Sequence, residues 1–434
     1  MSIELTSLTA MVALLAIVAV LRPAMLFEYP VAASVLIWSF ILPQAWRIEA
    51  SGDLNDFEPT LAWGYMILCI SCTAIGYWAG RVRTPTTSHN SLEQLSQRYD
   101  LNKLFYGAVA LTIVGGSGVF LMYRMAATLK VGEAWTGPIA FYAFVAQLLI
   151  YGASLAWLLY LYTGDKKALI VSILGFCVNL PAVLFAARRE LTFIIVVVFL
   201  LGLFFVKKKS VSRLILVPMV LAGGIFINNA GTIRSFIVNN DASLIGAIAA
   251  NADQDTAAKE FSEVGSGVSD IAISQWTEQY DLLTPYYNGL INLYIPAFIV
   301  GPDFKKQLKV KRDDYEQSKY ESFSRGGATH TGFADSFQSL HYFGCLIFLV
   351  IAYFMGILWS KARSGDIKSQ LYYMMLISVC LKVFTESTSV FFSILPLMFL
   401  SMGGVFWYAR QRKPSGQHVS TLAEMHRPLR DAHR

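Results

Sequence analysis

A charged triplet, Arg188-Arg189-Glu190, separates two long apolar segments of this sequence. The second segment, residues 191–206, is short for a membrane span and is followed by the lysine run 207–209, so we expect the triplet to lie below the opposite membrane surface. Guanidinium groups form paired hydrogen bonds with phosphate oxygens. The two arginines therefore suit an anion-binding site, although they could also extend to lipid headgroups.

Arg234 follows the next apolar segment, at the end of the run Asn228-Asn229-Ala230-Gly231-Thr232-Ile233-Arg234. Asparagine and glycine favour the end of a helix. An unwound helix end beside an arginine suits an anion site, and it equally suits an ordinary exit from a span. With Arg188 and Arg189, this residue would place three guanidinium groups at the outer end of the spans.

A glycine-rich segment, residues 324–337, gathers groups suited to acid–base chemistry. Arg325 and Asp335 each lie within five residues of His330, and the segment leads directly into an apolar span. Histidine exchanges protons near neutral pH. His330 could therefore act on a substrate, or it could simply be solvated.

Lys382 and Glu386 form the only ionisable pair well inside an apolar segment. Their spacing places both side chains on one face of a helix. They could form an internal salt bridge, or they could line the same cavity as the arginines.

The composition shows which elements must position these residues. Of 434 residues, 55% are apolar and 15% are charged, with a net charge of +6. Soluble domains contain about 25% charged residues. This balance excludes disorder, a nucleic-acid-binding surface and a small disulfide scaffold.

Apolar runs long enough to cross a bilayer recur along the chain. We expect an all-α polytopic integral membrane protein with about 11 transmembrane helices, within a range of about 10–12, and one large extracytoplasmic loop. The predicted spans are residues 5–21, 30–46, 60–80, 104–123, 138–162, 168–187, 191–206, 214–230, 340–359, 371–387 and 389–408.

Lysine and arginine are concentrated in one alternating set of the short connections and in the tail. The positive-inside rule then predicts an outer N-terminus and a cytoplasmic C-terminus. The predicted units are residues 1–230 with about eight spans, a periplasmic loop over 231–339, residues 340–408 with about three spans, and a tail over 409–434. Within the loop, residues 241–264 read as an amphipathic helix and residues 288–301 as a re-entrant or interfacial segment.

The sequence predicts no metal site and no cofactor. Cys69 and Cys72 have the spacing of a zinc or redox motif, but they lie in an apolar run without histidine or further cysteine partners, so we expect them to pack. There is no phosphate-binding P-loop and no dinucleotide-binding fingerprint.

In these features the sequence resembles the Wzy-type polymerases of O-antigen and exopolysaccharide repeat units, which belong to the GT-C-like O-antigen polymerase and ligase superfamily. The resemblance rests on the many spans with one late outer loop and on the arginine hairpin. It also rests on the pattern Tyr287-Asn288-Gly289…Ile295-Pro296 and on the entry to the next span from Thr329 to Gly344. The basic residues usual around the Ile-Pro element are displaced here to Lys305 and beyond.

The resemblance implies a metal-independent glycosyltransferase of the bacterial inner membrane that acts on its periplasmic face. The donor would be an undecaprenyl-diphosphate-linked oligosaccharide, and the acceptor a second lipid-linked repeat unit whose sugar hydroxyl attacks the donor's anomeric carbon. No ATP is implied, because the sugar–diphosphate bond supplies the driving force. A chain-length regulator protein is a further partner that the resemblance leaves open.

Roles for individual residues follow as hypotheses. The lipid diphosphate would bind Arg188, Arg189 and Arg234, with Arg325 as a further candidate and Lys382 steering it or pairing with Glu386. The general base would be His330, which has a suitable unperturbed pKa, or Glu190, Asp335 or Glu386, whose pKa burial would have to raise. We favour His330 slightly over Glu190.

Two other functions stay open at this stage. One is an O-antigen ligase, which would transfer the finished glycan from the same donor to lipid A core. The other is a non-enzymatic flippase or transporter of lipid-linked glycans. The sequence shows no internal repeat of the kind common in transporters, and its unusual charges gather at the outer end.

Overall fold

The computed structural model describes residues 2–51, 59–83, 92–126, 138–179, 189–209, 282–295, 300–310 and 331–411, together with residues 267, 268, 271, 274, 275 and 280. These parts of the chain are helical and contain no named strand; one isolated bridge joins Tyr99 to Arg410. The expected all-α class is therefore confirmed.

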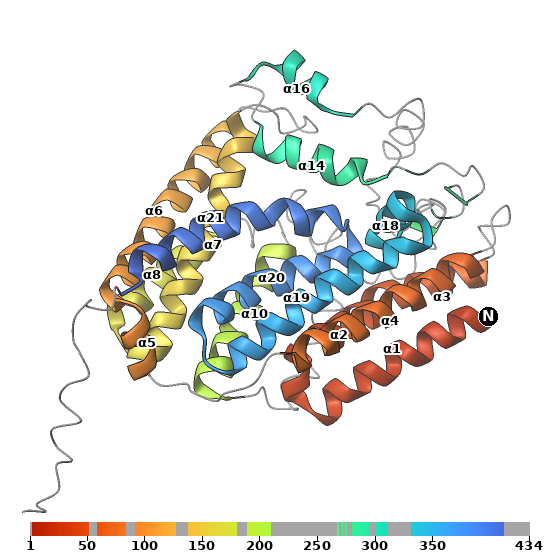
Figure 1. The fold of residues 1–434 in the computed structure, drawn as a ribbon, viewed down its shortest axis with the longest axis horizontal. Helices are drawn as coiled ribbons and strands as arrows, with labels where there is room; N and C mark the ends of the chain where they lie inside the picture. Colours follow the sequence, from red (N-terminus) through yellow and green to blue (C-terminus); the bar gives the residue numbers. More distant parts are fainter. Residues whose placement is uncertain are drawn as a thin grey trace, which may run out of the picture.

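Figure 1 shows a bundle of long helices with shorter helices across one end. The long helices are α1 (Ile3–Leu21), α4 (Thr60–Val82), α6 (Leu101–Ala126), α7 (Pro138–Thr163), α10 (Arg189–Lys207), α19 (Cys345–Arg363), α20 (Ile367–Thr385) and α21 (Ser389–Ala409). A further rod consists of α2 (Tyr29–Leu36), a π-helical turn (Ile37–Ile41) and α3 (Leu42–Ser51). The shorter helices are α5 (Leu92–Arg98), α8 (Lys166–Cys177), α14 (Thr284–Tyr294), α16 (Pro302–Leu308) and α18 (Gly332–Leu340).

Eight helical stretches of the described residues are long and apolar enough to cross a membrane. They are α1, the rod from α2 to α3, α4, α6, α7, the stretch from α18 to α19, α20 and α21. The chain is thus a polytopic membrane protein, while the figure of 11 spans stays a prediction. For the predicted spans 168–187 and 191–206, the structure describes α8 and a shorter apolar helix over Ile194–Lys207. The predicted span 214–230 and the amphipathic segment 241–264 lie outside the described residues.

One predicted span differs in shape from the expectation. The span placed at 340–359 belongs to an apolar stretch from Gly332 to Arg363 that is broken into α18, a 3-10 turn (His341–Gly344) and α19. His341 adopts a positive φ of 54° at the break. The predicted boundary was therefore late, because the polar-looking entry segment itself forms a helix whose residues are almost all buried.

Glycine allows α4 and α19 to pack closely. A Cβ atom on Gly80 would collide with the backbone carbonyl of Tyr353 on α19. Small residues permit such close approach between membrane helices, where van der Waals packing replaces the hydrophobic effect as the driving force. The α4–α19 pair thereby supports α18, which precedes α19 in the chain.

The contacts gather the basic connections at one end of the bundle, which we call the basic end. Arg81 Nη1 lies 2.8 Å from Glu28 Oε2, and the backbone N–H of Asp100 donates to the carbonyl of Ala409. Arg98 is within 3.9 Å of Asp366. Burial raises the pKa of Glu28, and the neighbouring Arg81 opposes that rise. The charge pattern of the sequence predicts that these linkers all lie on one side of the membrane.

The opposite end, which we call the loop end, carries α14, α16 and α18. Helix α20 runs between the two ends at the centre of the bundle, and 89% of its most apolar stretch is buried. A helix that is covered on all sides needs apolar residues all round rather than on one stripe. Its last turn carries Lys382 to the loop end, where the turn into α21 begins.

Candidate functional site

The turn between α20 and α21 is held by a carboxylate from α18. Asp335 Oδ2 accepts hydrogen bonds from Ser387 Oγ at 3.0 Å, from the backbone N–H of Thr388 at 3.0 Å and from Thr388 Oγ1. Thr388 is the residue that precedes α21, so the carboxylate lies at the positive end of that helix's dipole. Asp335 is only 9% exposed. Its charge therefore fixes the geometry of the turn.

Local sequence explains why α18 reaches this turn. Thr331 caps α18, because its Oγ1 accepts from the backbone N–H of Ala334. Gly332 follows at a position where a Cβ atom would collide with the carbonyl oxygen of Val383 on α20. The Thr-Gly pair thus brings the first turn of α18 against α20, which places Asp335 beside residues 387 and 388.

A tyrosine from α14 extends the network around Asp335. The hydroxyls of Tyr286 and Thr388 are hydrogen bonded, and Thr388 Oγ1 donates to Asp335. Since each hydroxyl has a single proton, Tyr286 must be the donor to Thr388. Burial, and then the charge of Asp335, raise the pKa of Tyr286, so the phenol stays protonated. Hydrogen bonds therefore run in one direction, from Tyr286 through Thr388 to the carboxylate.

Lys382 and Glu386 form the predicted ion pair in the last turn of α20. Lys382 Nζ lies 3.3 Å from Glu386 Oε2. The lysine side chain is 19% exposed and the glutamate side chain 41% exposed. The salt bridge expected from the spacing is thus present, and the same pair borders the turn that Asp335 holds. Glu386 is the more accessible of the two carboxylates.

A second tyrosine of α14, Tyr294, forms hydrogen bonds with the backbone of α21. Pro396 lies inside α21 and has no N–H, which opens the helix there. Tyr294 fills the opening, because its hydroxyl accepts from the N–H of Leu397 at 3.0 Å and donates to the carbonyl of Ser393 at 2.6 Å. Those two backbone groups would otherwise bond to each other. Helix α14 is thereby joined to the kink of α21.

On its other side, α14 holds the segment that contains α16. The Asn288 amide donates to the carbonyl of Val310 and accepts from its N–H, both at 3.1 Å. Lys305 Nζ donates to the carbonyl of Asn292 at 3.0 Å. Partial burial and the charge of Lys309 lower the pKa of Lys305. The segment 288–301, predicted as re-entrant or interfacial, thus starts within α14 and ends just before α16.

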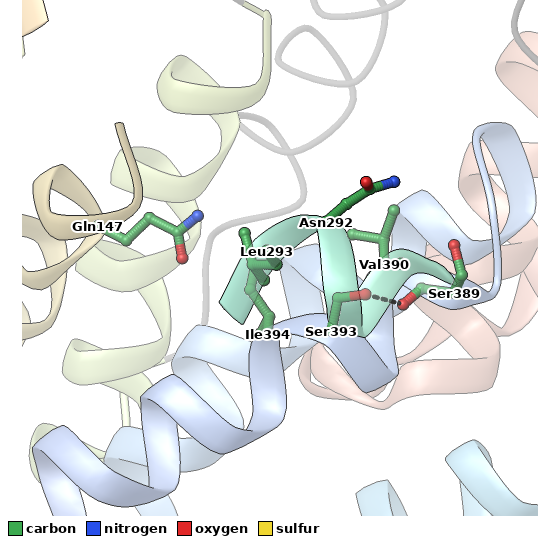
Figure 2. Close-up of a pocket in the computed structure, with 8 residues that line it drawn as sticks. Gln147, Asn292, Leu293, Ser389, Val390, Ser393 and Ile394 are labelled. Atoms are coloured by element: carbon green, nitrogen blue, oxygen red, sulfur yellow. Dashed lines mark hydrogen bonds between the residues drawn. The ribbon is translucent and has the colours of Figure 1, made fainter. Parts of the chain in front are cut away.

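A cavity of about 300 Å³ opens between α7, α14 and α21, next to the turn between α20 and α21 (Figure 2). Figure 2 shows Gln147 of α7 on one side of the cavity, with its amide directed towards Leu293 and Ile394 on the other side. The described lining residues are Gln147, Gly289, Asn292, Leu293, Ser389, Val390, Ser393 and Ile394. None of these eight side chains carries a formal charge.

The structure describes only part of the site predicted from the sequence. Asp335, Lys382 and Glu386 come together at the α20–α21 turn. Arg189 and Glu190 begin α10, but their side chains lie outside the described parts. The remaining predicted site residues, Arg188, Arg234, Arg325 and His330, lie outside the described residues altogether.

Sequence reasoning missed the hydroxyl groups that surround Asp335 and the cavity beside them. The polar run Thr385-Glu386-Ser387-Thr388-Ser389 between two apolar segments was a usable signal, because such runs cap helices. Gln147 is the one side-chain amide in its apolar segment, 138–162. Nothing in the sequence pointed to Tyr286, whose role comes from a contact over a separation of 102 residues.

Comparison with known proteins adds no relative. The chain matches no family model, no curated protein and no solved structure. Arguments about function therefore rest on the residues and their geometry. At the loop end these are a buried carboxylate, a lysine–glutamate pair and an uncharged cavity.

Proposed function

We propose that this protein polymerises undecaprenyl-diphosphate-linked oligosaccharide repeat units on the outer face of a bacterial inner membrane. The growing glycan is transferred from its lipid diphosphate to a sugar hydroxyl of the next lipid-linked unit. In this proposal the N-terminus and the loop end face the periplasm, and the basic end and the tail face the cytoplasm. The arginine hairpin and the loop motifs of the sequence are the basis for this choice of substrate.

The observation that carries the proposal is the α20–α21 turn. It combines a cation, Lys382, with two carboxylates at the end of the bundle where the sequence also predicts the arginine hairpin. Transfer from a lipid diphosphate needs fixed positive groups for the charge that develops on the leaving group. It also needs a proton acceptor for the attacking hydroxyl. Groups of both kinds are thus present at one end of the molecule.

The proposed reaction balances without a further reactant. The acceptor's hydroxyl oxygen forms a bond to the donor's anomeric carbon while the bond from that carbon to the diphosphate oxygen breaks. The lipid diphosphate leaves with the bonding electron pair, and the hydroxyl proton passes to the general base. Arg188, Arg189, Arg234 and Arg325 bind the diphosphate in this proposal, and Lys382 assists them.

The geometry sharpens the proposal for the base. Asp335 Oδ2 already accepts three hydrogen bonds, which suits a residue that positions the turn. Glu386, at 41% exposure, is the carboxylate that a substrate reaches more easily. Among the described residues Glu386 is therefore the more accessible candidate for the base, while His330, followed by Glu190, stays the favoured one.

Elongation by purified protein tests the assignment of the diphosphate site. Arg188→Ala and Arg189→Ala should each lower the rate of chain elongation by about 10²-fold or more, the usual effect of removing one donor to a developing charge. Lys166→Ala, which changes a basic residue in the first turn of α8 at the basic end, is the control and should leave the rate unchanged. Wild-type rates for both arginine variants would refute the proposed diphosphate site.

A further inference from the structure

The cavity between α7, α14 and α21 has a largely apolar wall that carries a few hydrogen-bonding groups without charge. Gln147 and Asn292 contribute amides, and Ser389 and Ser393 contribute hydroxyls. Leu293, Val390 and Ile394 add apolar surface between them. Small-molecule sites commonly combine such apolar walls with a few polar groups that orient the ligand.

One of these groups lacks a partner that it needs. The side-chain oxygen of Gln147 is buried and has no hydrogen-bond partner in the described structure. A buried acceptor that is left unpaired costs about 1–3 kcal/mol. Figure 2 shows this amide at the cavity, extended towards α14 and α21. A rotation of the amide that brings this oxygen to the cavity wall would let an occupant donate a hydrogen bond to it and remove the cost.

This requirement selects the chemistry of the occupant. The hydroxyls of Ser389 and Ser393 already have partners within the protein, but a hydrocarbon chain would leave the Gln147 amide unpaired. A phosphate or carboxylate would find no cation among the described lining residues. A sugar ring has hydroxyl groups at its edges and an apolar C–H face, so it matches both parts of the wall. The volume of about 300 Å³ is at the low end for ligand sites, as a single ring requires.

We propose that this cavity binds one neutral sugar residue of the lipid-linked glycan, an inference that rests on the proposed function. The cavity is connected to the turn of α20 and α21. Ser389 lines it and shares a 2.7 Å hydrogen bond with Ser387, which donates to Asp335. A ring bound here is therefore held beside the carboxylates of the site. Sequence motifs had assigned no role to Gln147, Ser389 or Ser393.

Gly289 offers a way to fill the cavity without breaking the fold. A Cβ atom at this position would meet only Ser393 Oγ, at 3.3 Å. Gly289 lies inside α14, where replacing glycine by a better helix former favours the helix by about 1 kcal/mol. Gly289→Leu should therefore occupy the cavity while α14 stays intact. Gly404→Leu, in α21, is the matched control, because a Cβ there has no atom within 4 Å.

The experiment measures binding of neutral methyl glycosides of glucose, galactose, mannose and N-acetylglucosamine to the full chain in nanodiscs. Ligand-observed saturation-transfer NMR detects such weak binding. We expect wild type and Gly404→Leu to bind at least one glycoside alike, and Gly289→Leu to bind it at least about tenfold more weakly. If Gly289→Leu fails to fold, Gln147→Leu replaces it and should also weaken binding.

Two results would overturn the inference. One is the absence of binding by wild type, which is also what a cavity filled by lipid would give. The other is unchanged binding when the cavity is filled or when the Gln147 amide is removed. Elongation of lipid-linked units by the same samples separates the two proposals. A wild type that binds glycosides but makes no longer chains contradicts the proposed function, whereas normal elongation by Gly289→Leu contradicts the sugar site.

Discussion

Asp335 shows what a single buried charge does in this molecule. Its carboxylate takes hydrogen bonds from residues 387 and 388 and so joins α18 to the start of α21. The sequence singled out Asp335 because it stood near His330 in a glycine-rich segment. It could not show that hydroxyl groups from α14 and from the α20–α21 turn surround the carboxylate, because those contacts depend on tertiary packing.

Asp335→Asn should destabilise the protein more than Glu386→Gln. Hydrogen bonds to a charged acceptor contribute about 1.5–3 kcal/mol each when buried, whereas an exposed i,i+4 ion pair contributes about 0.3–0.5 kcal/mol. The apparent melting temperature of each variant in nanodiscs measures the difference. Equal melting temperatures for the two variants would mean that Asp335 does not hold the turn.

Tyr286→Phe should make the protein less sensitive to alkali. Because the pKa of Tyr286 is raised above its unfolded value of about 10, its contribution to stability is complete below about pH 10 and falls as the pH rises further. Phenylalanine has no such proton to lose. Melting temperatures measured from about pH 8 to about pH 11 should therefore fall less steeply for the variant. A parallel fall in both proteins would show that the phenol of Tyr286 is not held protonated.

At the scale of elements, the long apolar helices could be predicted because each satisfies its own backbone hydrogen bonds and has the length that a bilayer requires. The breaks in these helices could not. The early start of α18, the turn at His341 and the opening at Pro396 depend on neighbours that are distant in sequence. Proline marked the position of the opening in α21, but only the contact with Tyr294 shows how its backbone groups are satisfied.

The bridge from Tyr294 to α21 predicts energetic coupling with Pro396. Tyr294→Phe alone should cost about 1–3 kcal/mol, because the N–H of Leu397 and the carbonyl of Ser393 lose their partner. In a Pro396→Ala background the helix can close that bond directly, so the same change should cost less. A double-mutant cycle on unfolding should therefore give a coupling of about 0.5–3 kcal/mol. Additive effects would exclude the bridging role.

At the scale of the whole molecule, the two ends differ in charge and in architecture. The basic end joins short connections through ion pairs and backbone hydrogen bonds, whereas the loop end carries short helices and the cavity. The sequence separated these two sets of connections by their lysine and arginine content, and the contacts at the basic end agree with that grouping. Which end faces the cytoplasm stays a prediction of the positive-inside rule.

Labelling of introduced cysteines tests this orientation. In a chain whose native cysteines are replaced by alanine, Phe304→Cys should react with a membrane-impermeant maleimide added to intact spheroplasts, since Phe304 is 51% exposed at the loop end. Arg83→Cys, at the exposed start of a connection on the basic end, should react only after the membrane is broken. The reverse pattern would invert the proposed topology and remove the outer-face reaction with it.

The central claim is that this chain alone elongates glycans on a lipid diphosphate. The most direct measurement incubates purified wild-type protein in nanodiscs with undecaprenyl-diphosphate-linked repeat units, without ATP or a second protein, and resolves the products by length. Our account predicts glycans longer than one repeat unit, with release of the lipid diphosphate. Repeat units that remain at their starting length, or that are transferred only when lipid A core is supplied, would contradict it.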